Sequence, residues 1–127
     1  MKRVLVVDDE IVLAQVIGEF LQDEGYAVLL AHMSQGVLEL LETERPDMMF
    51  LDVMMPDGDG RDIVKEMQSH PELQDIPVVM MSAGVPLQRL NVQVRGFLRK
   101  PFDIVELLSL VNDVIGPSQQ SGSSAPS

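Results

Sequence analysis

Apolar residues along the chain occur in short continuous runs, separated by longer stretches with helical spacing. Five such runs predict strands, at Val4–Val7, Tyr26–Ala31, Asp47–Leu51, Ile76–Met81 and around Phe97–Leu98. An apolar run without polar alternation is typical of a strand that is covered on both faces. The pattern therefore predicts five mostly buried strands, each ending in polar residues or a turn.

The first two intervening stretches predict amphipathic helices. A helix beginning near Glu10 is expected to end at Gly25 as its C′ residue. A second helix is predicted to be capped by Ser34, and Pro46 excludes its continuation. The predicted inward faces are Leu13, Val16, Ile17, Phe20 and Leu21 in the first helix, and Val37, Leu40 and Leu41 in the second.

Two further helices are predicted later in the chain. The third runs from Gly60 to about His70, and the turn-rich link Pro71–Asp75 follows it. The last begins after Asp103, a predicted N-cap, with Glu106 at N3 and a Phe102 to Leu107 staple. Its predicted inward face is Ile104, Leu107, Leu108, Val111 and Ile115. The additional apolar residues Val105, Leu110 and Val114 leave two interpretations open, ordinary burial or contact with a partner.

Strands that alternate with helices, each strand apolar throughout, specify a parallel sheet with helices on both faces. Five such units fit a flavodoxin-like, doubly wound α/β fold with strand order 2-1-3-4-5. Residues 1–116 are predicted to form this single domain. The remaining residues, 117–127, are rich in Ser, Gly and Pro and predict a flexible tail or linker.

Composition narrows the functional classes. The formal net charge is −11, with nine basic against twenty acidic residues, so no basic surface for nucleic acid is expected. The absence of cysteine excludes disulfides and thiolate chemistry. Apolar runs are too short for a signal peptide or a membrane span, and a cytoplasmic protein is expected. The methionines are interpreted as core filling, namely Met48, Met49, Met54, Met55, Met80 and Met81.

Chemistry is predicted at Asp52, which stands where the central strand meets the loop in FLDVMMPDGDG. Alone, such an aspartate is more often part of a turn or a cap. In the predicted strand order, however, Asp8 and Asp9 lie beside Asp52, and Ser82 and Lys100 reach the same edge of the sheet.

Three neighbouring carboxylates repel one another and require a positive charge. Oxygen ligands without histidine or cysteine suit a hard cation, and Mg²⁺ fits best. With Mg²⁺ and Lys100 in place, Asp52 is predicted to stay ionised and to act as a nucleophile in phosphoryl transfer. Ser82 is predicted to donate a hydrogen bond to the attached phosphoryl group.

Four motifs in order resemble the receiver domain of two-component response regulators. They are VVDDE after the first strand, LDVMMPDGDG after the third, Ser82 followed by Ala83, and LRKPF after the fifth. The resemblance covers roughly residues 2 to 116. It implies that Asp52 is the phosphoacceptor, that Asp9 binds Mg²⁺ directly and Asp8 largely through water, and that the Met54 carbonyl is a further ligand.

The resemblance also implies roles for residues near the last strand. Ser82 and Lys100 match the family's hydroxyl and lysine, and the bond from Lys100 to Pro101 matches a peptide that is usually cis. Phe97 matches a rotating aromatic switch residue, although a core position is also open for it. His32 and His70 receive no role.

One segment departs from the family. Between Ser82 and Lys100 the chain is about one helical turn shorter than the family norm and lacks a helical stripe. The fourth helix is therefore expected to be short, displaced or partly unwound. This puts in doubt a homodimer through the face formed by helix 4, strand 5 and helix 5, which the resemblance otherwise implies.

The predicted function is a signalling domain, not an enzyme of turnover. Its implied partners are a histidine kinase or phosphotransfer protein and an output domain or separate effector. A docking module without phosphorylation is one alternative. An aspartyl-nucleophile phosphatase is another, but such enzymes place a second acid where this chain has Met54. Flavin or nucleotide binding is weaker still, because no Gly-rich loop follows the first strand.

Overall fold

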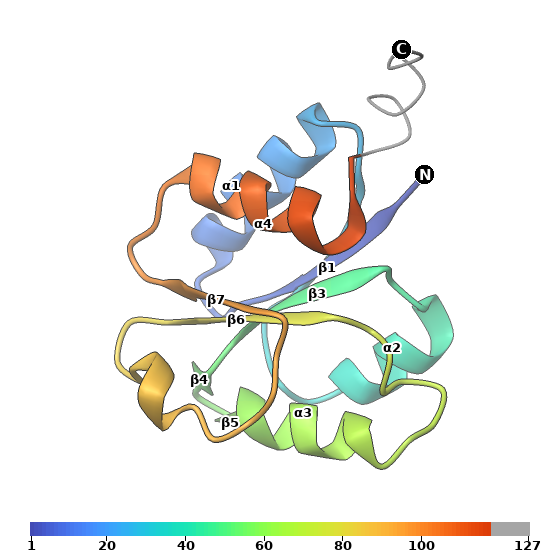
Figure 1. The fold of residues 1–127 in the computed structure, drawn as a ribbon, viewed down its shortest axis with the longest axis vertical. Helices are drawn as coiled ribbons and strands as arrows, with labels where there is room; N and C mark the ends of the chain where they lie inside the picture. The colour runs from blue at the N-terminus through green and yellow to red at the C-terminus, as the bar shows by residue number, and fades with distance from the viewer. Residues whose placement is uncertain (118–127) are drawn as a thin grey trace.

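The computed structural model describes residues 1–117, which form a parallel β-sheet between two layers of helices (Figure 1). The sheet has the strand order β2-β1-β3-β6-β7, and all four pairings are parallel. The strands are β1 (Arg3–Val7), β2 (Ala27–Ala31), β3 (Met48–Asp52), β6 (Val78–Ser82) and β7 (Gly96–Arg99). The predicted doubly wound fold is confirmed, because β6 and β7 are the fourth and fifth strands of this sheet.

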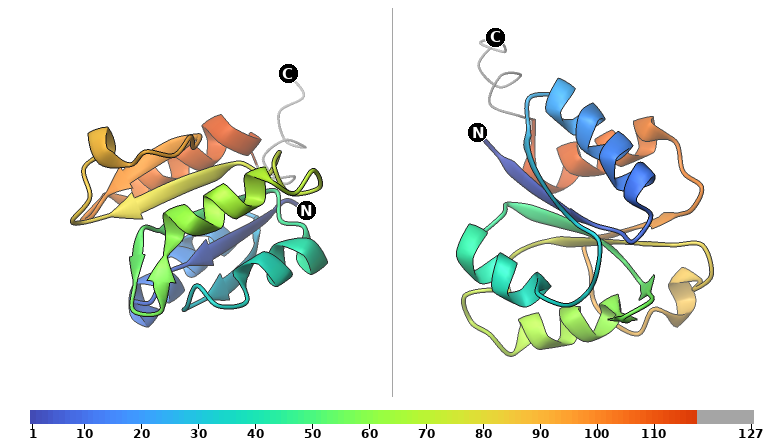
Figure 2. Two further views of the ribbon diagram at one scale, coloured as in Figure 1. Left: turned by 90° about the horizontal axis from the view of Figure 1, so that it is seen from below. Right: turned by 180° about the vertical axis from the view of Figure 1, so that it is seen from behind.

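Helices cover both faces of the sheet (Figures 1 and 2). On one face lie α1 (Ile11–Asp23) and α4 (Ile104–Ile115), and on the other lie α2 (Val37–Glu44) and α3 (Gly60–Gln68). An antiparallel hairpin of β4 (Met54–Met55) and β5 (Gly58–Asp59) follows β3. The apolar pattern does not predict this hairpin, because its strands are only two residues long.

The central strands send successive side chains into two hydrophobic clusters. On β3, Met49 and Leu51 join the cluster beneath α2 and α3, whereas Met48 and Phe50 join the cluster beneath α1 and α4. This alternation follows from the two-residue period of a strand. Both clusters are apolar, which explains why the central strands contain so few polar residues. Five of the six methionines named above are buried, and Met54 is exposed.

The face that α1 buries differs from the prediction in two positions. Ile17 and Leu21 are buried as expected, but Val16 and Phe20 are 40% and 42% exposed. The remaining buried positions are Ala14 and Gly18. A side chain at Gly18 would meet Val28 on β2, so the helix lies close to the sheet along these small residues and turns its larger ones outward. The predicted C′ residue, Gly25, has a φ of +95°, the left-handed conformation that glycine adopts readily.

The predicted helix caps have different outcomes. The Ser34 cap is wrong, because the N-cap of α2 is Gly36 and the Ser34 amide donates to Asp57 instead. Asp103 does occupy the N-cap position of α4, but its side chain makes no capping hydrogen bond. Asp59 caps α3 by accepting a hydrogen bond from the Arg61 amide.

The segment between β6 and β7 contains a single 3₁₀ turn, η1 (Leu87–Arg89), in place of a full helix. The expectation of a short or unwound fourth helix is therefore confirmed.

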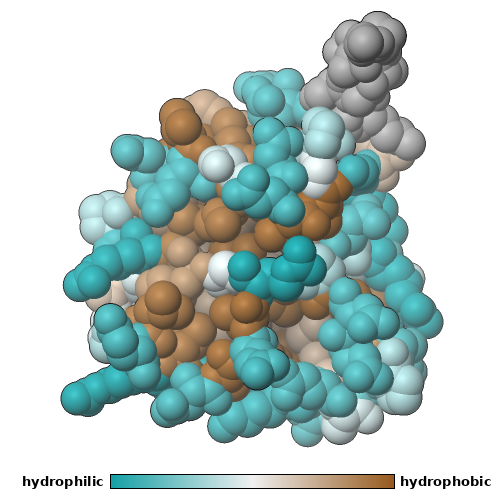
Figure 3. Space-filling model, in the orientation of Figure 1, coloured by the Kyte–Doolittle hydropathy of each residue, from teal (hydrophilic) through white to brown (hydrophobic). Residues whose placement is uncertain are grey.

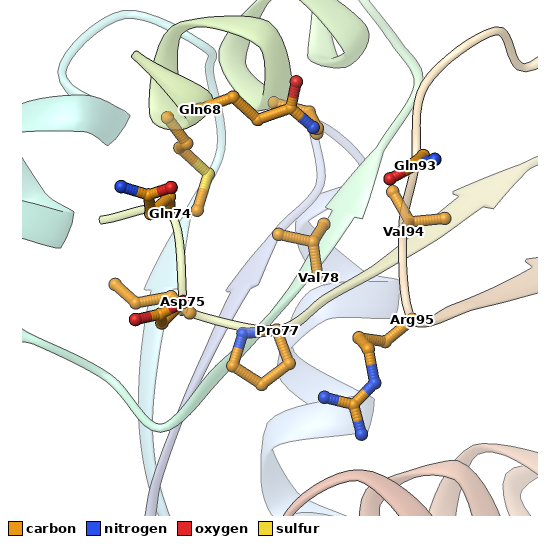
Figure 4. A pocket seen from close by; sticks show the side chains of 11 residues that line it. Gln68, Gln74, Asp75, Pro77, Val78, Gln93, Val94 and Arg95 are labelled. Atoms are coloured by element: carbon orange, nitrogen blue, oxygen red, sulfur yellow. The ribbon is translucent and has the colours of Figure 1, made fainter. Parts of the chain in front are cut away.

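Between α3 and the chain leading into β7 lies a hollow of about 330 Å³, lined by Gln68, Val78 and Arg95 among others (Figure 4). Apolar surface gathers around β7 and the adjoining parts of α4 and η1 (Figure 3).

Helices within residues 1–117 fall short of the length and apolar content that crossing a membrane requires.

Candidate functional site

The candidate site lies at the carboxyl ends of the central strands. Asp8 follows β1, Asp52 ends β3, Ser82 ends β6 and Lys100 follows β7. Parallel strands bring these ends to one edge of the sheet, where the strand order reverses between β1 and β3. One pocket of about 430 Å³ is lined by Asp9, Asp52, Ser82 and Lys100, and the buried Asp8 contacts Lys100 at its edge. The predicted meeting of these residues is thus present in the structure.

Three carboxylates form the acidic part of the site. Carboxylate oxygens of Asp8, Asp9 and Asp52 all lie within 4.8 Å of one another. Asp8 and Asp52 are buried and Asp9 is partly exposed. Such close like charges are unfavourable in a low-dielectric environment unless a cation offsets them.

Lys100 supplies the positive charge. Its Nζ lies 2.8 Å from Asp8 Oδ2, 2.8 Å from Glu10 Oε2 and 3.3 Å from Asp52 Oδ2. The ammonium group is largely buried among these oxygens. One cation therefore faces a cluster of four acidic side chains, Asp8, Asp9, Glu10 and Asp52, which leaves a net negative site.

The protonation equilibria reflect this crowding. Burial raises the pKa of Asp52 to about 6, Lys100 opposes the shift, and the charge of Asp8 adds to it. Burial opposes the charged form of Lys100, but its interactions with Asp8, Glu10 and Asp52 outweigh burial and raise its pKa. Lys100 is accordingly charged at neutral pH. A further positive charge near Asp52 would lower the pKa of its carboxyl group.

The donor set fits a hard divalent cation. Asp8 Oδ1 accepts a hydrogen bond from the Glu10 amide at 2.9 Å. The other oxygen, Oδ2, is buried, and its partner within residues 1–117 is the Lys100 ammonium at 2.8 Å. Three carboxylates that lie this close together beside one ammonium suit the oxygen coordination that Mg²⁺ prefers, including coordination through water.

Ser82 points its hydroxyl at the following loop. Its Oγ accepts hydrogen bonds from the amides of Gly84 at 3.1 Å and Val85 at 2.9 Å. The side chain is buried at the pocket wall. The hydroxyl therefore fixes the start of the segment that replaces the fourth helix.

Two further predicted features lie beside the pocket. Phe97 on β7 is partly buried and packs against the cluster beneath α2 and α3, outside the pocket lining. The peptide bond between Lys100 and Pro101 is cis, as the family resemblance implies.

Sequence reasoning did not assign roles to two residues that contact the site. Glu10 pairs with Lys100; its position directly after Asp8 and Asp9 indicated that it lies at the site, but not that it contacts Lys100. His32 lies with Nδ1 at 3.1 Å from the Asp8 carbonyl oxygen, which no sequence pattern indicated. Glu10 thus contacts the site through Lys100, and His32 contacts it through the backbone of Asp8.

Comparison with known proteins assigns the family. The response regulator receiver domain matches residues 4–112, and the chain belongs to this family. The solved structure of the chemotaxis response regulator CheY4 of Vibrio cholerae superimposes with a TM-score of 0.80 at 30% identity, covering 90% of this chain and 98% of that one.

Longer regulators are also similar. The transcriptional regulatory protein CpxR of Klebsiella pneumoniae is 35% identical over 125 residues, covering 95% of this chain and 52% of that protein. The response regulator MprA of Mycobacterium ulcerans is 34% identical over 111 residues, covering 84% of this chain and 47% of that protein. The chain thus spans about half the length of these curated relatives.

Proposed function

We propose that this receiver domain accepts a phosphoryl group on Asp52 from a histidine kinase or a phosphotransfer protein and signals by a change of conformation. The observation that carries the proposal is the acidic cluster at the strand ends, with oxygens of Asp8, Asp9 and Asp52 within 4.8 Å of one another. Lys100 Nζ lies 3.3 Å from Asp52 Oδ2 at the same place.

In the proposed step, a carboxylate oxygen of Asp52 forms a bond to the phosphorus of a phosphohistidine. The P–N bond breaks, and its electron pair stays on the imidazole nitrogen, which takes up a proton. Asp52 must be ionised to attack. Its pKa of about 6 leaves it mostly ionised at neutral pH, and Lys100 supports that state.

Mg²⁺ is the proposed cofactor, held by Asp9 directly, by Asp8 largely through water, and by Asp52 and the Met54 carbonyl. When bound, it supplies positive charge that offsets the charge on the phosphoryl oxygens. Lys100 would turn from Glu10 toward the same oxygens, because its ammonium already lies within reach of Asp52.

The signal is proposed to start at Ser82. Its hydroxyl would donate to the attached phosphoryl group and so draw on the loop whose amides it now accepts, at Gly84 and Val85. Phe97 would then turn into the space vacated beside β6. Phosphorylation would shift a population between two conformations that a partner reads.

The remaining proposals concern what surrounds the domain. Residues 1–116 are proposed as the receiver and 117–127 as a linker, of which residues 118–127 lie outside the described part of the chain. The receiver is proposed to act in the cytoplasm on an output domain or a separate effector. A homodimer through η1, β7 and α4, the counterpart of the face predicted from the sequence, remains a prediction.

The alternatives have less support in the site. A phosphatase of the aspartyl-nucleophile type needs a second acid two residues after Asp52, and the side chain there is the exposed thioether of Met54. A docking module that works without phosphate has no use for three crowded carboxylates.

The test is phosphorylation itself. A small-molecule phosphoryl donor with Mg²⁺ should add one phosphoryl group to the wild type by intact mass, and Asp52→Asn should abolish the addition. Beryllofluoride with Mg²⁺ should shift amide resonances of the wild type only. An Asp52→Asn protein that is still modified, or that still responds to beryllofluoride, would refute the assignment. Turnover of a generic phosphate ester would favour the phosphatase.

A further inference from the structure

We propose that Asp57 is a positioning residue for the metal site. It fastens the β4–β5 hairpin to the loop between β2 and α2, and so holds the Met54 carbonyl in place for Mg²⁺. This inference rests on the proposed function, in which Met54 contributes a ligand beside Asp52.

The fastening consists of two hydrogen bonds from backbone amides. Asp57 Oδ1 accepts from the Ser34 amide and Oδ2 accepts from the Gln35 amide, each at 2.9 Å. Both carboxylate oxygens are thereby directed at the loop before α2. These bonds also lower the pKa of Asp57, so the carboxylate is charged whenever the protein is near neutral pH.

Asp57 stands at the tip of the hairpin whose base carries the site. Met54 pairs with Asp59 and Met55 pairs with Gly58, which leaves Pro56 and Asp57 in the turn. The base is fixed by the Gly60 amide, which donates to the Val53 carbonyl at 2.7 Å. Asp57 therefore fixes the turn of the β4–β5 hairpin, whose first residue, Met54, lies two residues after Asp52.

The two loops also approach closely beside this contact. A Cβ built on Gly58 would lie 2.5 Å from Ser34 Oγ, so the hairpin has space there for glycine but not for a larger residue without movement of Ser34. The two loops thus touch at the surface of the protein, and the two exposed hydrogen bonds set the register of this junction.

The end of β2 and the start of the same loop contact Asp8, on the other side of the acidic cluster. The Asp8 amide donates to the Ala31 carbonyl at 3.0 Å, and His32 Nδ1 lies 3.1 Å from the Asp8 carbonyl oxygen. Residues 31–35 therefore brace both Asp8 and the hairpin that bears Met54. Loss of the Asp57 hydrogen bonds would release the β4–β5 hairpin from this loop, while Asp8, Asp52 and Lys100 would stay in place.

The expected consequence is weaker Mg²⁺ binding with unchanged chemistry at saturation. A ligand that is held in place before binding loses less freedom when the metal arrives. Groups that orient metal ligands without touching the metal commonly change metal affinity by roughly tenfold or more. Asp57→Ala should therefore raise the Mg²⁺ Kd by roughly tenfold, and Asp57→Asn, which keeps one acceptor oxygen, should raise it less.

The experiment compares Asp57→Ala and Asp57→Asn with Asp62→Asn in the full chain. Asp62 is an exposed acid in the first turn of α3, so its substitution removes the same charge without touching the junction. Mg²⁺ Kd is measured from amide chemical shifts, and the phosphorylation rate is measured at saturating Mg²⁺ with a small-molecule phosphoryl donor. Asp62→Asn should change the Kd by less than about twofold, and the rate at saturation should match the wild type in all three variants.

Hydrogen exchange at the amides of Ser34 and Gln35 reports the junction directly and should accelerate in Asp57→Ala. A purely structural role would lower thermal stability without moving the Kd of the folded protein. If Asp57→Ala and Asp57→Asn both bind Mg²⁺ as tightly as Asp62→Asn does, the inference is overturned while the proposed function stands. A wild type that neither binds Mg²⁺ nor accepts phosphate would instead overturn both.

Discussion

The two faces of the sheet are covered to different extents. On one face α1 and α4 are helices of 13 and 12 residues. On the other face α2 and α3 have 8 and 9 residues, and the next helical element in the chain is the three-residue η1. The hollow in Figure 4 opens on this second face, beside α3.

The difference shows that the position of the site depends on the strands, whereas the cover of the sheet depends on the helices. The polar groups of the site stand at the ends of β1, β3, β6 and β7, so they meet whether or not a full fourth helix forms. Phe97 and the loop held by Ser82 belong to the thinly covered face. A shortened fourth helix therefore leaves the proposed chemistry intact and alters the surface that would report it.

The sharpest comparison of the two faces is a pair of core truncations. Leu107 on α4 is fully buried in its cluster, and Leu107→Ala should lower the free energy of unfolding by about 3 kcal/mol. Met67 on α3 is nearly as buried but borders the hollow, and Met67→Ala should cost about 2 kcal/mol or less, because fewer atoms surround the removed group. Urea unfolding measures both. Equal losses would mean that the second face is packed as tightly as the first.

The next largest effect concerns Asp52, at the edge of the sheet where the strands end, between the two helical layers. The pKa of Asp52 in the folded protein, about 6, lies above its unfolded value of 3.8. The folded state therefore holds the Asp52 proton more tightly than the unfolded state does. This contribution to stability is complete below the unfolded pKa, and it is lost as the pH rises through the folded pKa. In EDTA at about pH 8, Asp52→Asn should be more stable than the wild type by about 1–3 kcal/mol.

The pH dependence separates this effect from a general change in packing. The advantage of Asp52→Asn should shrink toward zero near about pH 4, where the wild-type carboxyl is also neutral. Saturating Mg²⁺ should stabilise the wild type more than the variant, because a ligand of the native state raises its stability. A difference that is constant across this range would contradict the assignment of the effect to the charge.

Helix caps give a smaller comparison, with one aspartate on each face. Asp59 accepts a hydrogen bond from the Arg61 amide at 2.8 Å, and Asp59→Ala should cost about 1 kcal/mol. Asp103 holds the same position on α4 without a side-chain cap bond, so Asp103→Ala should cost less than about 0.5 kcal/mol. Thermal unfolding at neutral pH checks both. The reverse order would show that the cap bond on α4 forms in solution.

The smallest effect is expected for exposed apolar side chains. Val105 on α4 is 73% exposed and Leu87 on η1 is 56% exposed. Val105→Ser and Leu87→Ser should each change stability by less than about 0.5 kcal/mol, because little buried area is lost. A larger loss for Val105→Ser that depends on protein concentration would favour the interpretation of this surface as a contact with a partner.

The sheet and the convergence of its strand ends could be predicted because both follow from repeated local patterns. Apolar runs identify the strands, and the strand order alone brings Asp8 and Asp52 together. For the segment between β6 and β7, the lack of helical spacing predicted that a full helix would not form, but it did not predict the 3₁₀ turn that is present. The exposed positions of Val16 and Phe20 could not, because they depend on how closely Ala14 and Gly18 let α1 approach the sheet.

The links between loops were also beyond the sequence. Ser34 has the residue type and position of an N-cap, but its amide donates to Asp57, which is 23 residues away in the chain. Glu10 pairs with Lys100 across 90 residues. Such contacts depend on the side-chain geometry of two loops at once, and neither loop carries a periodic signal.

Gly60 sets a limit that would be visible in a library of all twenty amino acids at each position. A Cβ there would lie 2.2 Å from the Asp52 carbonyl oxygen, which belongs to the backbone and cannot rotate away. A Cβ at Gly84 would meet nothing within 4 Å. Selection for folded protein should therefore return glycine alone at position 60 while accepting alanine at position 84. Close approach of a peptide group to the strand end thus restricts mutation at position 60 through folding alone, independently of the chemistry of the acidic side chains.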